Sequence, residues 1–573
     1  MLQKKIIRRP YDISSAMRHL PPLLQRVYAA RGISEPRQLE RGAKALLDFS
    51  GLCHMNAAVS VLLEAIEKRQ HIMIVGDYDA DGATGTSLAV RALKNFAAAK
   101  VSYLVPNRFD FGYGLTPEIV ELAYQQKPDI LITVDNGIAN IAGVRLANQL
   151  GMRVIITDHH LPGEQLPPAT AIVNPNQPTC HFASKSLAGV GVIFYVMVAL
   201  RAALREKHWF EQQQIPEANM ADLLDLVALG TVADLVPLDK NNRILVYQGL
   251  QRIRCGKCCP AITALLHLAK RDPATVAATD LAFAVGPRLN AAGRLQDMSL
   301  GIECLLSDDA LTAEKNAEQL HQLNDERRQI EADMQQQAMT MLNTIHLSDD
   351  LPYGLCLFDK NWHQGLIGIL ASKIKNKTHR PVIIFAEDGN GKLKGSARSI
   401  SGIHIRDVLA NIHAKHPDLI TKFGGHAMAA GLSIADTDFN VFQKAFIDEL
   451  QQFVTDDLLQ AQLITDGELT TDVLNLDTVA LLQQAGPWGQ GFPEPVFDGI
   501  FDIIDQRLLA EKHLKLTLKK EASHYEAIAF FIDNTLWPNP RCQQVHIVYR
   551  PDCNLYGGIS KLQLVVEYLE PVY

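Results

Sequence analysis

An alternation of strand-like and helix-like segments over residues 71–160 limits the folds that this chain can adopt. Four apolar, β-branched runs begin about 25 to 30 residues apart, and their sequences are HIMIVG, VSYLVP, DILITV and MRVIIT. The segments between them are helical in character, and Thr116 with Pro117 gives one of them a cap and a first-turn proline. This alternation predicts a parallel, doubly wound α/β sheet.

Polar side chains follow each of the four predicted strands. In chain order they are Asp77, Asp79 and Asp81, then Asn107 and Arg108, then Asp135, then Asp158, His159 and His160. Open α/β sheets bind ligands at the carboxyl ends of their strands, so we expect these side chains to share one site. Helix capping could explain Asp135 or Asp158 alone, but it does not explain the whole set.

The first of these groups, DYDADG at residues 77–82, also matches the first six positions of an EF-hand calcium loop. The twelfth position of such a loop is a glutamate, whereas this chain has Leu88. The segment before it is strand-like, and an EF-hand needs an incoming helix. We therefore exclude a calcium loop, but three close carboxylates still require cations to offset their repulsion.

Aspartates with one or two histidines and no thiolate favour manganese or magnesium as the bound metal. Two such ions about 3.5–4 Å apart could bridge a phosphate, activate water and stabilise a leaving oxygen. The site therefore indicates hydrolysis of a phosphoester or a phosphoanhydride. A nucleoside triphosphate loop is excluded because no Walker lysine follows GDYDADGATG, and three acids would repel the pyrophosphate of a dinucleotide.

The sequence beyond residue 220 predicts further helices and two more domains. The helical segment ADLLDLVALGTVADLVPL carries Asp234 at its end. Residues 311–351 contain neither Gly nor Pro, and they predict one helix of roughly 35 residues, about 50 Å long. We favour a strut between lobes over an intermolecular coiled coil. Five strand-like runs after residue 460 predict a small barrel of the OB type.

A second α/β lobe is predicted between the long helix and the barrel. YGLCLFD and PVIIFAE are predicted strands around the helix WHQGLIGILASKI, and we interpret KLKGSARSIS and KFGGHAMAAG as glycine-rich loops. Side chains of these loops suggest a phosphate track, namely Lys392, Lys394, Ser396, Arg398 and His426, although a lone histidine is more often structural. In the stretch GPRLNAAGR, Arg288 and Arg294 could hold phosphates bidentately on either side of Asn290, unless they are ordinary surface arginines.

Length and composition set broader limits. A chain of 573 residues predicts roughly three or four domains. The net charge of −8 argues against coating nucleic acid through bulk charge, but it allows a local basic channel. Nine scattered cysteines, with only CGKCC as an incomplete zinc half-site, favour a reduced cytoplasmic setting. The N-terminus lacks a signal-peptide apolar region, and the apolar run at residues 187–200 predicts a buried helix.

The motifs DYDADG, PNR, VDNG and TDHH, in this order and spacing, resemble those of the DHH phosphoesterase superfamily. The second lobe, with GSARS and GGH, looks like the DHH-associated domain. GPRLNAAGR, the long helix and the C-terminal barrel narrow the resemblance to the single-strand-specific DNA exonucleases of that superfamily. It covers nearly the whole chain, and no motif position departs from it.

The resemblance implies a two-lobed α/β fold, in which a parallel-sheet DHH domain is joined by a long helix to a smaller α/β DHH-associated domain, followed by a C-terminal OB-like β-barrel. The expected boundaries are 1–50 for an N-terminal extension packing on the catalytic domain, 51–310 for the DHH catalytic domain, 311–350 for the connecting helix, 351–455 for the DHH-associated nucleic-acid-binding domain, and 456–573 for the single-strand-binding barrel.

The resemblance also implies a role for each matching residue. The implied ligands of two manganese or magnesium ions are Asp79, Asp81, Asp135, His159 and Asp234, with Asp77 as a further ligand or as a partner that orients them. His160 is implied to lie beside the scissile phosphate as general acid or transition-state stabiliser, with Asp81 and Asp135 as its catalytic companions. The implied nucleic-acid-binding residues are Arg108 and Arg288, and less directly Asn290, Arg294, Ser372, Ser396, Arg398 and His426.

By the same resemblance, the chain is expected to degrade single-stranded DNA 5′→3′ to 5′-mononucleotides, in recombinational and mismatch repair. The lobes would admit one strand only, and the barrel would hold the incoming strand by stacking and charge. The expected partners of a monomeric protein are single-strand-binding protein and a RecQ-type helicase. Two alternatives stay open, namely a superfamily enzyme acting on a small substrate and a non-catalytic DNA-binding protein with a decayed site.

Overall fold

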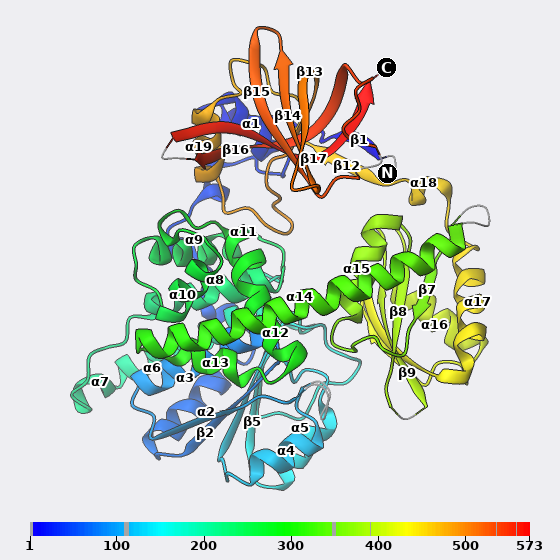
Figure 1. Cartoon of the computed structure of the whole chain (residues 1–573). Coiled ribbons are helices and arrows are strands. Elements are labelled where there is room, and N and C mark those ends of the chain that lie inside the picture. Colours follow the sequence, from blue (N-terminus) through cyan, green and yellow to red (C-terminus); the bar gives the residue numbers. More distant parts are fainter. Residues whose placement is uncertain are drawn as a thin grey trace. The chain divides into compact units, whose positions relative to one another are not determined.

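The computed structural model of this chain describes residues 4–107, 114–346, 351–389, 391–533, 536–556 and 559–572. The chain divides into two compact units, whose elements are labelled along the ribbon in Figure 1. The smaller unit comprises Met1–Arg9, Asp325–Thr465 and Ile532–Trp537. The larger unit comprises Pro10–Asn324, Asp466–Phe531 and Pro538–Tyr573.

The larger unit contains a five-stranded parallel sheet with the order β3-β2-β4-β5-β6. Its strands are β2 (His71–Gly76), β3 (Lys100–Leu104), β4 (Ile130–Val134), β5 (Arg153–Thr157) and β6 (Ala171–Val173). Every residue of β2 and β4 is buried, as expected for strands covered on both faces. The four predicted strands are confirmed, whereas the three-residue strand β6 was not predicted.

Helices flank this sheet in the order that the alternation predicted. They are α2 (Met55–Glu67), α3 (Ala80–Asn95), α4 (Pro117–Tyr124), α5 (Ile141–Gln149) and α6 (Gly189–Glu206). Side chains of α4 and α5, such as Ile119 and Val144, share one buried cluster with Met73 and Leu131 of the sheet. The apolar run at residues 187–200 lies largely within α6 and is almost wholly buried, as predicted.

A helical layer completes this part of the larger unit. Its helices are α8 (Leu224–Ala233), α9 (Lys240–Arg254), α10 (Pro260–Leu268), α12 (Gly286–Leu295) and α13 (Ser299–Leu306). All residues from Leu224 to Val232 are buried, so α8 is a core helix that ends at Asp234. Among the described residues no single helix has the length and apolarity to cross a membrane, although the bent pair Ala43–Gly51 and Met55–Glu67 together meets those two criteria.

The long helix predicted between the lobes is confirmed as α14 (Ala310–His346), which has 37 residues. Leu320, Leu323 and Met334 lie on its buried side. These positions recur along one side of the helix, so one stripe of it is covered within the chain itself.

The smaller unit contains a second five-stranded sheet with the order β10-β11-β9-β8-β7. Its strands are β7 (Leu355–Phe358), β8 (Val382–Glu387), β9 (Lys392–Arg398), β10 (Lys422–Gly425) and β11 (Ala429–Ala435). Only β7 and β8 are parallel, and the other neighbours are antiparallel. Its helices are α15 (Ile367–Thr378), α16 (Ile405–Lys415) and α17 (Phe439–Leu450).

The interpretation of KLKGSARSIS and KFGGHAMAAG as loops is wrong, because these segments form β9, β10 and β11. Residues of β9 alternate between exposed and buried, which is the pattern of a strand with one covered face. Gly395 is small for a packing reason, since a Cβ atom there would come within 2.6 Å of the Phe385 ring. Gly395 therefore marks close packing of strands rather than a turn.

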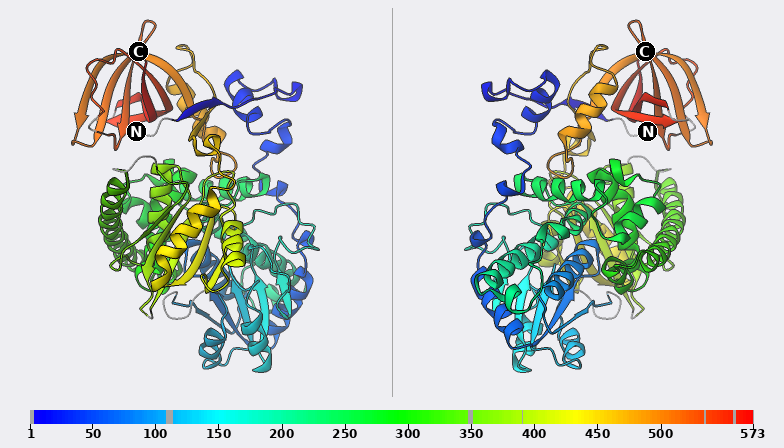
Figure 2. Two further views of the ribbon diagram at one scale, coloured as in Figure 1. Left: turned by 90° about the vertical axis from the view of Figure 1, so that its right-hand side faces the viewer. Right: turned by 90° about the vertical axis from the view of Figure 1, so that its left-hand side faces the viewer.

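The predicted C-terminal barrel is confirmed. Its strands are β13 (Phe497–Leu509), β14 (His513–Lys520), β15 (Ser523–Phe530), β16 (Gln544–Tyr556) and β17 (Ile559–Val572). They close in the order β13-β14-β15-β17-β16, with only β15 and β17 parallel, and Figure 2 shows the closed ring from two sides. The interior is apolar, with Phe497, Phe501 and Tyr549 fully buried.

The N-terminal segment contributes to both units. In the smaller unit, β1 (Lys5–Arg8) pairs in parallel with β12 (Gln462–Thr465). In the larger unit, α1 (Pro22–Ala29) is followed by Arg31, which forms a bidentate, buried ion pair with Asp466. This contact ties the N-terminal segment to the chain that leads into the barrel.

Candidate active site

The acidic and imidazole side chains predicted for one site lie together at the carboxyl edge of the parallel sheet. Strands β2 and β4 are neighbours in the sheet. After β2 the chain continues to β3 on one side, whereas after β4 it continues to β5 on the other side. This is the point at which such a sheet reverses its winding and opens room for a ligand. The loop after β2 carries Asp77 and Asp79, Asp81 follows in the first turn of α3, and the loop after β4 carries Asp135.

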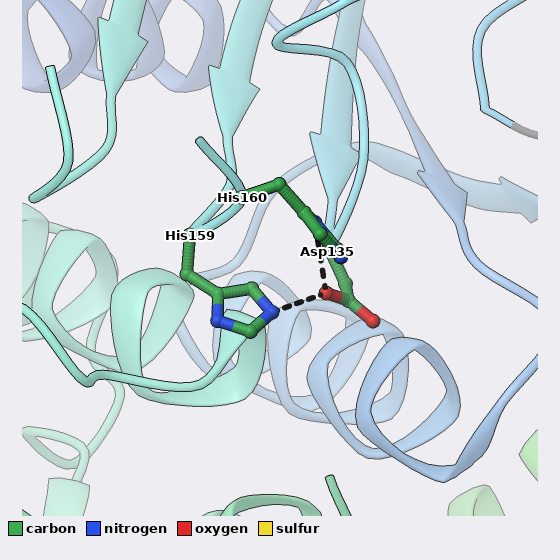
Figure 3. A group of neighbouring side chains, drawn as sticks. All are labelled: Asp135, His159 and His160. Atoms are coloured by element: carbon green, nitrogen blue, oxygen red, sulfur yellow. Dashed lines mark ion pairs between the residues drawn. The ribbon is translucent and has the colours of Figure 1, made fainter. Parts of the chain in front are cut away.

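His159, after β5, points into the carboxylates. Its Nε2 atom lies 3.0 Å from Asp135 Oδ1, 3.5 Å from Asp234 Oδ2 and 3.9 Å from Asp81 Oδ2. Figure 3 shows His159 and His160 beside Asp135. The structure thus brings Asp234, from the end of α8, to the strand ends although it is about 75 residues further along the chain.

Three overlapping groups of ligand atoms could each hold a metal ion, with all atoms of a group within 4.8 Å of one another. They are Asp135 with His159 and His160, Asp81 with His159 and Asp234, and Asp77 with Asp79 and Asp135. All six predicted metal ligands therefore lie in one cluster. The cysteines of CGKCC belong to none of these groups, so the zinc alternative finds no support among the described residues.

Burial and mutual repulsion disfavour ionisation of this cluster when no cation offsets it. Burial, followed by the charge of Asp79, raises the pKa of Asp81 to about 7. Burial and then the charges of Asp81 and Asp79 raise the pKa values of Asp135 and Asp234 well above the usual range. Buried carboxylates that repel one another fit a site for divalent cations, since bound cations would restore their ionised form.

The two neighbouring histidines have opposite protonation states. Burial and the nearby His160 lower the pKa of His159 to about 4, so its ring is neutral and able to bind a metal. Burial alone would also lower the pKa of His160, but its hydrogen bond with Asp158 and that carboxylate's charge raise it to about 9. The bond joins His160 Nδ1 to Asp158 Oδ1 at 2.8 Å, so His160 is a cation beside the acidic cluster.

Backbone amides hold two of the carboxylates in place. Asp79 caps α3 by accepting hydrogen bonds from Asp81 N at 2.9 Å and Gly82 N at 3.1 Å. Asp81 accepts from Gly189 N at 2.6 Å and Val190 N at 2.8 Å, at the first turn of α6. Both carboxylates therefore face helix N-termini, where negative charge is stabilised.

Close approach and backbone strain shape the loop after β4. Asp135 has a positive φ of 64°, a left-handed conformation that few non-glycine residues adopt and that aspartate tolerates better than most. A Cβ atom on Gly189 would come within 2.6 Å of Asp135 Cβ. A Cβ atom on Gly230 of α8 would come within 3.0 Å of Asp81 Oδ1. Small residues on α6 and α8 thus allow both helices to reach the acidic loops.

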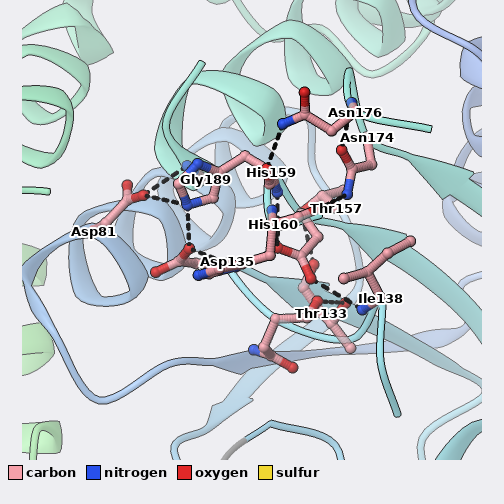
Figure 4. A network of polar contacts seen from close by, with 12 residues as sticks. Asp81, Thr133, Asp135, Ile138, Thr157, His159, His160, Asn174, Asn176 and Gly189 are labelled. Atoms are coloured by element: carbon pink, nitrogen blue, oxygen red, sulfur yellow. Dashed lines mark hydrogen bonds and ion pairs between the residues drawn. The ribbon is translucent and has the colours of Figure 1, made fainter. Parts of the chain in front are cut away.

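Sequence reasoning included Asp158 without assigning it a role, and it missed other side chains that support this site, among them Asn174 and Asn176, which Figure 4 labels. Asn136 Nδ2 donates to Val75 O at 3.1 Å and to Val134 O at 2.9 Å, which joins the ends of β2 and β4. Asp158 Oδ2 accepts from Ile138 N at 2.9 Å. The position of Asp158 two residues before His160 is a signal that could have identified it as the partner of that ring.

The stretch GPRLNAAGR forms helix α12, which packs on the acidic loop. Asn290 Oδ1 accepts a hydrogen bond from Ala80 N at 2.8 Å, and a Cβ atom on Gly293 would come within 1.8 Å of Tyr78 O. Arg288 is buried and donates to Ala284 O, and Arg294 lies in the last turn of the helix. Arg108, the other predicted phosphate ligand, lies outside the described residues.

The remaining predicted residues belong to the smaller unit. Arg398 Nη1 donates to Ser396 Oγ at 3.1 Å, and Ser372 Oγ donates to Gly368 O at 3.1 Å. A Cβ atom on Gly368 would come within 2.8 Å of Arg398 Nη2. Ser396 and Arg398 of β9 therefore lie against the turn of α15 that contains Gly368 and Ser372. His426 follows β10, and its main-chain N–H donates to Ala429 O at 2.8 Å.

Models of three known domains match this chain. They are the DHH family, N-terminal domain, at residues 71–231, the DHHA1 domain at 351–456 and the RecJ OB domain at 465–568. Curated relatives named "Single-stranded-DNA-specific exonuclease RecJ" match over the whole chain. The relative from Dickeya dadantii is 50% identical, covering 99% of each chain, and that from Escherichia coli is 48% identical, covering 100% of each.

Solved structures of RecJ from Thermus thermophilus have the same fold. Its complex with Mn²⁺ is 29% identical with a TM-score of 0.80, covering 99% of this chain and 79% of that one. Its complex with Mg²⁺ is 26% identical with a TM-score of 0.76, covering 99% and 78%. The fold and the acidic site thus define a protein of the DHH class. Within that class, the chain belongs to the RecJ family.

Proposed function

We propose that this chain is an exonuclease that degrades single-stranded DNA from its 5′ end to 5′-mononucleotides, using two manganese or magnesium ions. The observation that carries the proposal is the cluster of five aspartates and His159 at one sheet edge, with the cationic His160 beside it. The names of the relatives and the Mn²⁺ and Mg²⁺ complexes of the Thermus protein support it.

The residues have complementary tasks in this proposal. Bound divalent ions supply Lewis acidity, which activates water and offsets the charge that develops at phosphorus. The buried carboxylates and neutral His159 hold those ions, with Asp135 contributing to two of the three groups of ligand atoms. His160, kept protonated by Asp158, donates a hydrogen bond or a proton to an oxygen of the scissile phosphate.

Phosphates further along the strand require cationic or hydrogen-bonding partners. We propose Arg288 and Arg294 of α12 with Ser372, Ser396, Arg398 and His426 of the smaller unit for this role, together with Arg108. The barrel would hold the incoming strand. The recombination and repair setting, the cytoplasmic location, the monomeric state and the single-strand-binding protein and RecQ-type helicase as partners remain predictions.

Digestion of end-labelled DNA tests the proposal. With Mn²⁺ present, a 5′-labelled single strand should release labelled mononucleotide at once, whereas a 3′-labelled strand should shorten progressively. Blunt duplex of the same sequence should resist. Release of mononucleotide from the 3′ end, or digestion of blunt duplex alone, would contradict the proposed polarity and strand preference.

Substrate length separates this function from hydrolysis of a small phosphoester by the same chemistry. An enzyme that uses the barrel and the smaller unit should cleave long oligonucleotides much faster than dinucleotides at equal concentration. Equal rates would favour the small-substrate alternative. The matches to the DHHA1 and RecJ OB domains over residues 351–456 and 465–568 favour a polymer.

A further inference from the structure

The backbone of the two active-site histidines is held by side chains. His159 and His160 follow β5 and belong to no helix or strand. Asp158 Oδ1 accepts from His159 N at 2.7 Å and from His160 N at 3.1 Å. Asn176 Nδ2 donates to His159 O at 2.6 Å, and Asn174 Nδ2 donates to His160 O at 2.9 Å. Three side chains thus bond all four main-chain polar groups of the pair.

This support matters because the two imidazoles have different tasks. His159 directs Nε2 at Asp135, whereas His160 directs Nδ1 at Asp158. Their ring centroids are 4.6 Å apart, with 57° between the ring planes. A rotation of the peptide that follows either histidine would displace that residue's ring, so the site depends on how firmly the backbone of each histidine is fixed.

Asn174 and Asn176 follow β6, the strand that was not predicted from the sequence. Strand β6 pairs in parallel with β5, with Thr157 opposite Val173. The next bond along the ladder runs from Asp158 N to Val173 O at 3.2 Å. Asn174 therefore emerges beside Asp158, and it is fully buried. The short edge strand places an amide next to the histidines, as Figure 4 shows.

Hydrogen bonds within the loop after β6 hold Asn176 in place. Asn176 N donates to Asn174 Oδ1 at 2.7 Å, and Asn176 Nδ2 also reaches Lys185 O at 3.2 Å. Lys185 Nζ in turn donates to Pro175 O and Cys180 O, each at 2.6 Å.

An ordinary turn explains only part of this arrangement. The bond from Asn176 N to Asn174 Oδ1 is a side-chain turn of the kind that asparagine often forms. A turn of this kind does not require the side-chain NH₂ group of either asparagine. In this chain both NH₂ groups donate to histidine carbonyls.

We propose that Asn174 and Asn176 are positioning residues of the active site, which fix the backbone of His160 and His159, respectively, through the carbonyl of each histidine. Asn176 acts on His159 and so sets metal affinity, whereas Asn174 acts on His160 and so sets the rate at saturating metal. The proposal deepens the proposed function and rests on it.

Replacing Asn176 with leucine separates shape from hydrogen bonding, because leucine has a similar volume and no donor. In Asn176→Leu, the Mn²⁺ affinity of the full-length chain, measured by calorimetry, should fall about 10- to 100-fold, as is typical when a partner of a metal ligand is lost. Its kcat at saturating Mn²⁺ should stay close to that of the wild type. Asn174→Ala should reduce kcat at saturating Mn²⁺ with KM for DNA unchanged, and it should lower Mn²⁺ affinity less than Asn176→Leu does, because Asn176 loses only one of the bonds that hold it.

Asn241→Ala is the matched control in the same unit. Asn241 is buried and accepts from Tyr195 O–H at 2.9 Å and Leu47 N at 3.1 Å, and neither partner belongs to the acidic site. This variant should lower the melting temperature without changing Mn²⁺ affinity or kcat.

The outcomes distinguish this inference from the proposed function. Wild-type Mn²⁺ affinity in Asn176→Leu, or losses in both variants that match the loss of folded protein in Asn241→Ala, would overturn the positioning role alone. A wild-type chain that binds no Mn²⁺ and leaves single-stranded DNA intact would overturn the proposed function and this proposal with it.

Discussion

The two five-stranded α/β sheets present their polar residues in different ways because their strands run differently. In the sheet β3-β2-β4-β5-β6 of the larger unit all strands are parallel, so segments from three strand ends meet at one edge and bring buried carboxylates together. In the smaller unit most neighbours are antiparallel, so strand ends are divided between two edges. Its polar residues lie along one strand instead, on the face of β9 opposite the buried Leu393, Gly395 and Ala397.

The polar face of β9 is formed by alternate residues. Lys392, Lys394, Ser396 and Arg398 share it, while Leu393, Gly395 and Ala397 are buried on the other face. Successive residues on one face of a strand are about 6.7 Å apart. The parallel sheet therefore concentrates carboxylates at one place, the cluster of Asp77, Asp79, Asp81, Asp135, His159 and Asp234, which we call the point site and which suits metal ions. Strand β9 instead spreads the positive charges of Lys392, Lys394 and Arg398 along a line, which suits a phosphate chain.

The strongest way to break this contrast is to remove charge from the point site. Asp135→Asn keeps the shape of the side chain, and asparagine tolerates the positive φ at this position. We expect kcat to fall by about 10³-fold or more, because both groups of ligand atoms that share Asp135 lose a carboxylate. We also expect the melting temperature of the metal-free protein to rise, since one buried like charge disappears.

Single-turnover digestion of 5′-labelled DNA and thermal unfolding in a chelator measure the two effects. Asp129→Asn is the control, because Asp129 lies at the opposite, amino edge of the same sheet and accepts from His71 N at 2.8 Å. Asparagine can still accept that bond, so activity should be unchanged. Activity within about tenfold of the wild type in Asp135→Asn would show that the point site does not carry the chemistry.

A matched pair of glycine substitutions sharpens the contrast further. A Cβ atom would come within 2.6 Å of Asp135 Cβ in Gly189→Ala, and within 2.6 Å of the Phe385 ring in Gly395→Ala. Overpacking of this kind costs about 1–3 kcal/mol of unfolding free energy in each case. Only Gly189→Ala should also lower kcat, because Asp135 and the amides that hold Asp81 would move.

Denaturant unfolding and kcat, measured at a temperature where both variants are folded, give the comparison for this pair. Equal losses of kcat in the two variants would mean that the sheets are coupled in catalysis rather than divided in their tasks.

The residues of the point site could be predicted from the sequence, but the side chains that hold His159 and His160 in place could not. Asp77 to Asp81, Asp135 and His159 follow long apolar runs, so their convergence could be predicted from strand direction alone. Strand β6 could not be predicted, because three apolar residues before Asn174 carry no periodicity. Asn174 and Asn176 resemble turn residues in sequence, and their bonds to the histidines depend on pairing between β5 and β6.

The same reasoning explains the error in the smaller unit. The glycine content of these segments is typical of loops, and it outweighs the weak alternation that a strand requires. The alternation of buried and exposed residues in β9 is present in the sequence, but Gly395 and Ala397 do not look apolar enough to mark a buried face. The small size of Gly395 is set by Phe385 and Leu432, which approach from neighbouring strands.

A change on the line of positive charge should alter binding rather than chemistry. In Arg398→Ala we expect KM for single-stranded DNA to rise about tenfold with kcat unchanged. The slope of log affinity against log salt should shrink by about 0.7, as for one lost phosphate contact on a single strand. Arg406→Ala on α16, an exposed arginine of the same unit, is the control. A lower kcat with unchanged salt dependence would contradict the role of β9.

The smallest expected effect is a pH dependence. It should affect Mn²⁺ binding by the aspartates of the point site but not DNA binding by the arginine of β9. Because the pKa of Asp81 is raised to about 7 without metal, protons compete with Mn²⁺ for this carboxylate. The ionised fraction of Asp81 falls as pH falls through that value, so the apparent Mn²⁺ affinity should drop at least about threefold from about pH 7.5 to 6.5. Calorimetry in two buffers of different ionisation enthalpy should show at least about half a proton released per chain near pH 7, since Asp135 and Asp234 also have raised pKa values.

The line of positive charge should not respond to the same change of pH. The contribution of Arg398 to DNA binding, measured as the difference between wild type and Arg398→Ala, should stay constant over this range, since arginine stays charged. A pH-independent Mn²⁺ affinity would mean that Asp81 is already ionised in the metal-free site. In that case the amides of Gly189 and Val190, which donate to this carboxylate, would outweigh its burial.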